Sequence, residues 1–578
     1  MELTGLDWTF IIWYFVISIG IGMYYAKKAG SSISDYFISN RNIPWWIAGT
    51  SMVATTFAAD TPLAVTGIVN GKNGIAGNWL WWCLALSGML TVFVFAKLWR
   101  RSEVLTDIEF TELRYSGKPA AVLRGFRAVY LGILINCIIM GWVILGMSKV
   151  IEVTSTWPKF QTIVICTGIT LLYTMASGYW GVVTTDFFQF LLAMICAIIL
   201  AILAVSDIGG IGELKTRLVA IYGADHTKLN FLPAPNSDWW LLFFIYLAVL
   251  WWSTWYPGAE PGGGGYVAQR ILSTRSEKDS VFATLWFNIA HYALRPWPWI
   301  VVALVALVYY PGLDDPELGY PKMMSRLLPV GLKGLMIASF LAAFMSTVNT
   351  HINWGASYLV NDLYKRFLKK DGSTKHYVLI SRLLTILIVI VAGITAYIMQ
   401  SIVGAWELLL LIGAGTGLVY LLRWFWWRIN AWTEIAAMAS AFVLAIVLWK
   451  LLKIDWSLCF IMNVGITTVI WLIVTFITQP TNKSTLLAFY NKIKPGGFWG
   501  PIAKEAESQD PTLRDFKSKY SLKKELFNWF LGVVMVYTML FGIGKIILGD
   551  VLIGFIFLGL FVLAAIAIVW NFKKGILV

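Results

Sequence analysis

Apolar runs of about 20 residues recur from one end of this 578-residue chain to the other. A helix of that length crosses the hydrocarbon core of a bilayer, and a chain with many such runs folds as a polytopic helical membrane protein. Charged residues make up 13% of the chain, against roughly 25% in soluble proteins. We therefore expect an all-α protein that crosses a lipid bilayer many times.

Fifteen spans are predicted from these runs. They cover about residues 7–26, 44–70, 77–98, 122–151, 160–178, 182–206, 238–272, 280–310, 331–364, 377–400, 404–423, 431–451, 456–478, 526–547 and 551–571.

Basic residues gather in every second loop between these spans. Lys27 and Lys28 follow the first span, Lys573 and Lys574 follow the last, and the polar segment 479–525 carries several more. Cytoplasmic loops are the ones enriched in Lys and Arg. We predict a multi-pass protein of a bacterial-type inner or plasma membrane, with its N-terminus outside and its C-terminus in the cytoplasm. The net charge of +14 is explained by these loops, so no nucleic-acid partner is expected.

Two of the predicted spans are interrupted. The span 44–70 contains TTFAADTPLAVTG, with Asp60 and Thr61 at mid-depth, and the span 238–272 contains WWSTWYPGAEPGGGGYVAQR, with Glu260 in the middle. Pro removes a backbone donor and Gly weakens a helix, so neither span can remain continuous. Paired broken helices in matching positions indicate a midplane binding site between two inverted repeats.

A third span, within GLMIASFLAAFMSTVNTHINWGASYLVNDLY, carries hydroxyl and amide side chains. Ser346, Thr347 and Thr350 lie at helical spacing, so one helix face can present several oxygens to a small hard cation. The alternative is that these hydroxyls bond back to carbonyls of their own helix.

Three stretches together resemble the sodium:solute symporter family, which includes sodium–glucose, sialic acid and proline symporters. They are SMVATTFAAD, LLYTMASGYWGVVTTDFFQ, and the pair Ser346-Thr347 followed by Asn353 and then Asp362-Leu363-Tyr364. The resemblance implies a LeuT-type fold of two inverted five-helix repeats with discontinuous helices. One extra helix precedes these repeats and about four follow them.

On that basis the chain divides into five parts. They are an N-terminal extra helix (1–40), a transport core (41–425, with repeats at about 41–207 and 238–425), extra helices (426–478), a cytoplasmic loop with one short amphipathic helix (479–525), and C-terminal helices (526–578).

The resemblance also implies a sodium site, with Na⁺ as the ion and no other cofactor. Its oxygens would be the backbone carbonyls of Ala54, Phe57 and Ala343 and the hydroxyls of Ser346 and Thr347. Asp186 matches a family position that belongs to a second sodium site or aids ion release. Its alternative is a charge at a helix N-terminus, or a gate partner for a cytoplasmic Arg.

The substrate residues are predicted from position and chemistry. Asp60 and Thr61 stand where sugar-transporting relatives place an acid and an amide. Carboxylates accept hydrogen bonds from sugar hydroxyls, tryptophans offer a stacking face, and acids within spans are functional candidates. The full predicted set is Asp60, Thr61, Trp81, Trp82, Trp142, Glu260, Tyr266 and Glu407.

The predicted function is import of a small polar solute by sodium-coupled symport and alternating access. A sugar or polyol is the first choice of substrate, and a small carboxylate or amino acid is the second, with Arg295 available to an anion. An enzyme is not expected, because the four His residues show no metal-binding spacing. A channel or a transporter-like sensor is the rival of another class. The oligomeric state stays open.

Overall fold

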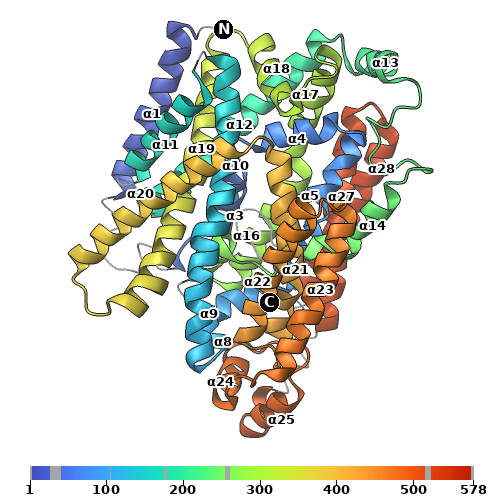
Figure 1. Ribbon diagram of the computed structural model, residues 1–578. Helices are drawn as coiled ribbons and strands as arrows, with labels where there is room; N and C mark the ends of the chain where they lie inside the picture. Colours follow the sequence, from blue (N-terminus) through green and yellow to red (C-terminus); the bar gives the residue numbers. More distant parts are fainter. Residues whose placement is uncertain are drawn as a thin grey trace.

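The structure is a computed structural model that describes residues 3–26, 41–104, 106–155, 157–174, 179–253, 261–513 and 522–573. Within these ranges the chain forms helices and no β-strand, with two isolated bridges, Ile43 to Thr274 and Trp426 to Phe498. Figure 1 shows the helices as one elongated bundle.

The helices follow one another along the whole chain. The first part contains α1 (Gly5–Ala26), α3 (Trp45–Thr56), α4 (Thr61–Asn70), η2 (Gly74–Asn78), α5 (Trp79–Trp82), α6 (Ala85–Leu90), η3 (Thr91–Phe95), α7 (Ala96–Ser102), α8 (Phe110–Arg114), α9 (Gly117–Val129), η4 (Tyr130–Ile135), α10 (Asn136–Thr154), α11 (Lys159–Thr174) and α12 (Tyr179–Asp207). The middle part contains α13 (Ile211–Tyr222), α14 (Trp240–Ala248), η5 (Leu250–Trp252), α15 (Gly265–Ser273), α16 (Glu277–Ile289), η6 (Ala290–Leu294), α17 (Pro296–Tyr309), η7 (Pro316–Leu318), α18 (Gly319–Leu327), α19 (Leu332–Ser357), η8 (Tyr358–Leu368), α20 (Thr374–Ile398) and α21 (Ile402–Phe425). The last part contains α22 (Ala431–Ala445), η9 (Ile446–Leu451), α23 (Trp456–Ile477), α24 (Lys483–Ile493), α25 (Gly500–Gln509), α27 (Leu522–Ile547) and α28 (Val551–Lys573).

The number of membrane-length helices is lower than the predicted fifteen. Among the described residues, eleven helices are long and apolar enough to cross a bilayer, and α3 with α4 makes a twelfth if this bent pair is one span. The other three predicted spans fall on shorter apolar helices at Gly5–Ile17, Lys159–Leu171 and Trp240–Trp252. Helix α1 as a whole is 22 residues long, which is enough to cross a bilayer.

The polar segment after α23 also differs from its prediction. Its described part contains two short helices, α24 and α25, where one was expected. They lie at the opposite end of the bundle from the start of α1 (Figure 1). Aromatic side chains fix this segment to the bundle: the ring of Phe489 lies 5.8 Å from Phe110 and 6.2 Å from Trp424.

Helix α1 is fastened to the start of α19. Asp7 of α1 accepts hydrogen bonds from the backbone N–H groups of Gly331 and Gly334, each at 2.8 Å. A Cβ at position 334 would lie 2.4 Å from the backbone oxygen of Asp7, so this close approach requires Gly334. Asp7 thus satisfies N–H groups at the N-terminus of α19, which have no partner within the helix.

The helices that carry the predicted sodium and substrate residues pack around the bent pair α3 and α4. Helix α12 contacts both α3 and α19, α16 contacts α3, and α17 contacts α4. Helix α10 passes close to the bend, because a Cβ on Gly146 would lie 2.6 Å from the Cα of Asp60. The centre of the bundle is therefore built around this break.

Candidate functional site

The break between α3 and α4 leaves four residues, 57–60, outside both helices in the middle of the bundle. The two helices are bent by 58°. The N–H of Phe57 bonds to the carbonyls of Val53 and Ala54, at 3.0 and 2.9 Å, and ends α3. Pro62 stands in the first turn of α4, where a missing N–H costs no hydrogen bond. The predicted interruption of this span is observed.

The five predicted sodium-site residues are all buried and come from the two sides of this break. Ala54 and Phe57 lie at the end of α3, and Ala343, Ser346 and Thr347 lie on α19. The helices touch here, because the Thr347 hydroxyl donates to the carbonyl of Thr55 at 3.2 Å. The Ser346 hydroxyl donates to Oδ1 of Asp186 at 2.5 Å. These hydrogen bonds run to other helices and not back into α19.

Asp186 joins four helices at this point. It is fully buried on α12, and its Oδ2 accepts a hydrogen bond from the Ser51 hydroxyl of α3 at 2.8 Å. A guanidinium nitrogen of Arg270, on α15, lies 3.8 Å from the same oxygen. The Arg270 Nε also donates to the Ser51 hydroxyl at 3.3 Å. Asp186 therefore has an arginine neighbour and a direct bond to a predicted sodium ligand, so both predicted roles fit its position.

Asp60 occupies the break itself and is fully buried. Among the residues that the structure describes, neither of its carboxyl oxygens has a hydrogen-bond partner. The indole N–H of Trp406, on α21, is directed at this carboxyl but lies outside hydrogen-bond geometry in the described part. Burial of a charge without partners is costly, so this carboxyl is suited to take hydrogen bonds from a ligand or water.

An arginine and a histidine from the junction of η6 and α17 line the same break. Arg295 donates to the carbonyl of Val53 at 3.2 Å and to the hydroxyl of Thr56 at 2.8 Å. The Nδ1 of His291 lies 3.2 Å from that hydroxyl. Arg295 is also within electrostatic reach of Asp60. The break thus combines an acid, a guanidinium and an imidazole.

The other predicted substrate residues are spread more widely. Thr61 lies at the break, with its hydroxyl 3.5 Å from the carbonyl of Thr56. Trp81 stacks on Tyr292 at 5.9 Å and meets the His291 ring edge-on at 5.7 Å, so it borders the site. Trp142 is fully buried on α10.

Two further predicted residues, Trp82 and Glu407, face other surroundings. Tyr266 lies beside two arginines of the site, Arg270 and Arg295, and Glu260 is not described. Trp82 packs on Trp79 and Phe541, at ring distances of 6.1 and 6.4 Å, on the side of α27. Tyr266 is buried beneath Arg270, whose guanidinium carbon lies 5.4 Å from the ring centre. Glu407 is half-buried, and its electrostatic neighbours are Lys450 and Tyr246. Glu260 lies outside the described residues.

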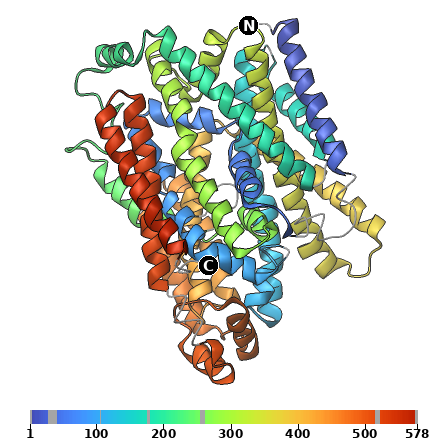
Figure 2. The same ribbon diagram turned by 180° about the vertical axis from the view of Figure 1, so that it is seen from behind.

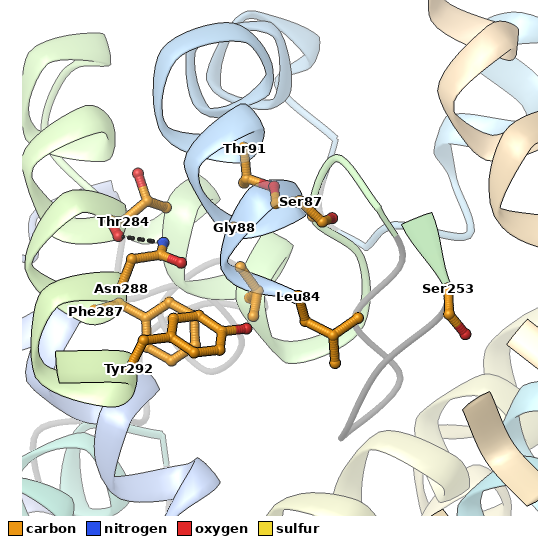
Figure 3. Close-up of a pocket in the computed structure, with 11 residues that line it drawn as sticks. Leu84, Ser87, Gly88, Thr91, Ser253, Thr284, Phe287, Asn288 and Tyr292 are labelled. Carbon is orange, nitrogen blue, oxygen red and sulfur yellow. Dashed lines mark hydrogen bonds between the residues drawn. The ribbon is translucent and has the colours of Figure 1, made fainter. Parts of the chain in front are cut away.

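A small cavity of about 40 Å³, with several hydroxyl and amide side chains in a mostly apolar wall, lies beside this site, between α6 and η3 on one side and α16 on the other. Figure 3 shows Ser87 and Thr91 facing Thr284 and Asn288 across it, with Tyr292 at one end. The Asn288 side chain donates to the carbonyl of Thr284 at 2.8 Å. Its own oxygen has no partner in the described ranges. A cavity of this size with these polar groups in its wall can hold a water molecule.

Sequence reasoning missed several of these residues. His291 and Trp406 were not predicted to take part, and the sequence gives no reason for the unusual stretch RPWPW at residues 295–299. In the structure this stretch starts α17 and supplies Arg295 to the break. An arginine within a predicted span is rare enough to have been a signal. The Trp406 indole had none, because 31 tryptophans are spread along the chain.

The described residues contain no group of three or more His, Cys, Asp or Glu side chains that could hold a metal ion. The oxygens at the predicted sodium site are hydroxyls and backbone carbonyls, with one carboxylate next to them. Such hard, mostly neutral oxygens suit an alkali cation better than a transition metal.

Comparison with known proteins gives one consistent answer. The model described as the sodium:solute symporter family matches residues 36–443. A sodium/glucose cotransporter of Vibrio parahaemolyticus is 25% identical over 441 residues, which cover 72% of this chain and 79% of that protein. A sodium/myo-inositol cotransporter of Homo sapiens is 24% identical over 429 residues, covering 67% of this chain and 58% of that protein.

The fold is also similar to that of a solved Na⁺-coupled sialic acid symporter. The TM-score is 0.67 at 19% sequence identity, and the likeness covers 83% of this chain and 99% of that structure. The family match includes the broken α3–α4 pair, Asp186 and the hydroxyl pair of α19. Sodium is a co-substrate of such a protein, not a resident cofactor. The chain therefore belongs to the sodium:solute symporter family, as a multi-pass sodium-coupled transporter and not an enzyme.

Proposed function

We propose that this symporter imports a sugar or polyol together with sodium, and that the break between α3 and α4 binds the solute. The observation that supports it is the Asp60 carboxyl, which is buried at the break without a hydrogen-bond partner among the described residues. A polyhydroxylated solute donates the hydrogen bonds that this group lacks. Trp81, next to His291, and Trp406, next to Asp60, add apolar faces for a sugar ring, and two relatives are named as glucose and myo-inositol cotransporters.

The proposed sodium site uses the carbonyls of Ala54, Phe57 and Ala343 and the hydroxyls of Ser346 and Thr347. The Ser346 hydroxyl donates a hydrogen bond to Asp186, so the lone pairs of the Ser346 oxygen remain available to the ion. Asp186 adds a negative charge next to the site. Arg270 at 3.8 Å competes for that charge, so movement of Arg270 would change how strongly the ion is held.

Coupling follows from the short distance along the chain between the two sites. Phe57, a proposed sodium ligand, is three residues from Asp60, the proposed solute ligand. An ion that fixes the end of α3 therefore also fixes the position of the acid. In the alternating-access cycle the sodium gradient and the membrane potential drive import, with about 2.3 kcal/mol per charge per 100 mV.

We also propose the LeuT-type arrangement of two inverted five-helix repeats, with the three shorter apolar helices completing fifteen spans. The start of α1 and the segment α24–α25 lie at opposite ends of the bundle (Figure 1), which fits an outside N-terminus and a cytoplasmic loop at 479–525. The C-terminus is assigned to the cytoplasm of a bacterial-type cell.

A second candidate substrate, a small carboxylate or amino acid, is favoured by Arg295. Its guanidinium lies at the same break as Asp60, and an acid–base pair of this kind suits a zwitterion. A guanidinium binds a carboxylate through two parallel hydrogen bonds.

The test is a thermal-shift screen of the purified protein with sugars, polyols, carboxylates and amino acids, in sodium and in choline. The solute found is then used for uptake into proteoliposomes with and without an inward sodium gradient. For a sugar, Asp60→Asn should lower uptake at least tenfold, since hydrogen bonds to a charged group are worth about 1.5–3 kcal/mol. Glu407→Gln is the matched control, because this acid has Lys450 and Tyr246 as neighbours.

The outcomes separate the proposals. A sugar or polyol that stabilises the protein only in sodium, and is taken up only with the gradient, supports the first choice. Stabilisation by carboxylates or amino acids that is lost in Arg295→Gln supports the second. Current without solute coupling would indicate a channel and reject both.

A further inference from the structure

An apolar groove on the outer surface of the bundle ends at two lysines. It has a volume of about 450 Å³ and runs between α16 and α28, with Met535 of α27 at its base. Figure 2 shows the end of α28 beside α16. The apolar residues that line it are Phe282, Leu285, Ile289, Met535, Phe561, Ala565, Ile568, Val569 and Phe572.

The two lysines lie at the same end of the groove. Lys278 is in the first turn of α16 and Lys573 is the last described residue of α28, and both are exposed. The rings of Phe282 and Phe572 stack at 5.1 Å, which holds these two helix ends together. The Lys278 amine lies 5.9 Å from the centre of the Phe282 ring. The groove therefore has one apolar end and one cationic end.

The acids next to Lys278 are engaged elsewhere. Glu277 forms an ion pair with Arg101 at 2.8 Å. Asp279 accepts a hydrogen bond from the Ser276 hydroxyl at 3.0 Å. Of the residues that line the groove, Lys278 and Lys573 are the charged ones. An anion at this end would thus meet positive charge without a competing carboxylate in the groove.

The groove opens to lipid. Helix α28 is a membrane span of which only 17% of the most apolar stretch is buried in the protein, the lowest share among the spans found in the described residues. An apolar hollow at that depth is accessible to acyl chains. The two lysines stand where α16 begins and α28 ends, which is the level of lipid head groups.

We propose that this groove binds an anionic phospholipid, with an acyl chain between α16 and α28 and its phosphate between Lys278 and Lys573. Basic residues between spans at the membrane surface are the usual receptors for acidic head groups, and lysine stems follow apolar surface while the amine stays at the interface. A zwitterionic lipid offers the same chain but no net negative charge.

The groove is connected to the transport core. Helix α16 packs closely on α3, since a Cβ on Gly49 would lie 2.6 Å from the carbonyl oxygen of Ala283. The indole of Trp286 donates to the hydroxyl of Thr50 at 2.9 Å. A lipid in the groove would contact the helix that separates the bilayer from the broken span.

The test uses native mass spectrometry of the full-length protein with phosphatidylglycerol or phosphatidylcholine of identical acyl chains. Each lysine near a membrane surface contributes roughly a fivefold preference for an anionic over a zwitterionic lipid. With two lysines, the wild type should retain phosphatidylglycerol about 25-fold better than phosphatidylcholine. Lys278→Gln with Lys573→Gln should remove this preference, and the two Lys→Arg changes should keep it. Lys369→Gln with Lys370→Gln, two exposed lysines on another helix end, is the charge-matched control.

A second variant tests the apolar part independently. Ala565→Trp fills the groove without a change of charge, so it should lower retention of both lipids. Equal retention of the two lipids by the wild type, or an unchanged preference in the double Gln variant, would overturn the proposal. So would a rise in unfolding temperature with inorganic phosphate that needs both lysines, because the site would then serve a free anion.

Discussion

The proposed sodium site can be tested by removal of its two hydroxyls. Ser346→Ala with Thr347→Val deletes both groups and keeps the volume of Thr347 nearly unchanged. The backbone carbonyls of Ala54, Phe57 and Ala343 remain, so three of the five proposed oxygens are left. Thr350→Val is the matched control on the same helix, since the Thr350 hydroxyl is buried and unpartnered within the described residues and is not one of the five proposed sodium ligands.

Two separate free energies change in the double variant. Without sodium, the folded state loses the hydrogen bond from Ser346 to Asp186 at 2.5 Å and the bond from Thr347 to the Thr55 carbonyl at 3.2 Å. The first has a charged acceptor and is worth about 1.5–3 kcal/mol, and the second about 1 kcal/mol. The free energy of unfolding should therefore fall by roughly 2.5–4 kcal/mol. The affinity for sodium should separately fall about 100-fold, because two oxygens are lost and each is taken to contribute about 1.4 kcal/mol to ion binding.

The assay is thermal unfolding of the purified protein across a sodium titration, with choline chloride to hold the ionic strength constant. Ligand that binds only the folded state raises the unfolding temperature with concentration, so the midpoint reports the sodium affinity. The double variant should need about 100 times more sodium, whereas Thr350→Val should titrate like the wild type. A wild-type midpoint in the double variant, or an equal loss in Thr350→Val, would refute the proposed ligands.

Three further outcomes are expected. Lys149→Met should lower the free energy of unfolding by about 3–5 kcal/mol in a denaturation experiment, because it leaves the buried Glu317, 2.5 Å from the amine, without its cation; a loss below 1 kcal/mol would contradict this. Gly146→Ala should cost about 1–3 kcal/mol in the same measurement, because the new Cβ would lie 2.6 Å from backbone at the break and cannot be relieved by side-chain movement; a neutral change would show that α10 can move away. The hydrogen bond from Lys545 holds the pKa of Asp550, in the turn between α27 and α28, below its ordinary value. The stabilisation by Asp550 is therefore present at neutral pH and lost as the pH falls below about 4, so the difference in unfolding temperature between the protein and Asp550→Asn should shrink between pH 7 and pH 3; a constant difference would argue against it.

Local chemistry in the sequence predicted the break in the second span and where that break lies. A proline directly after Asp60 and Thr61 cannot continue the hydrogen bonds of α3, and the bend occurs there. The contact between α3 and α19 also followed from the resemblance, since their proposed sodium ligands face each other across the Thr347–Thr55 bond. The first prediction depends on backbone rules for residues that are close together in the chain, and the second depends on the resemblance to the family.

Predictions that depend on tertiary packing were less complete. Glu407 was selected as an acid within a span, but its neighbours are Tyr246 and Lys450, while the adjacent Trp406 faces Asp60. One position along a helix rotates the side chain by about 100°, and sequence alone does not say which face meets the site. Arg295 was noted in the sequence as a residue for an anionic substrate, but its place at the break depends on the packing of the junction of η6 and α17 against α3.

The bond between Asp7 and the first turn of α19 has a mechanical consequence. Helix α1 packs on α12 and α19 on one side, and on the other side Trp8 and Trp13 are about half exposed. Asp7 accepts hydrogen bonds from the backbone of Gly331 and Gly334. While these bonds hold, any movement of α19 during transport also moves α1 through the surrounding lipid. The transport rate would then depend on the viscosity of the bilayer. A more viscous membrane would lower this rate without a change in the affinities for ion and solute.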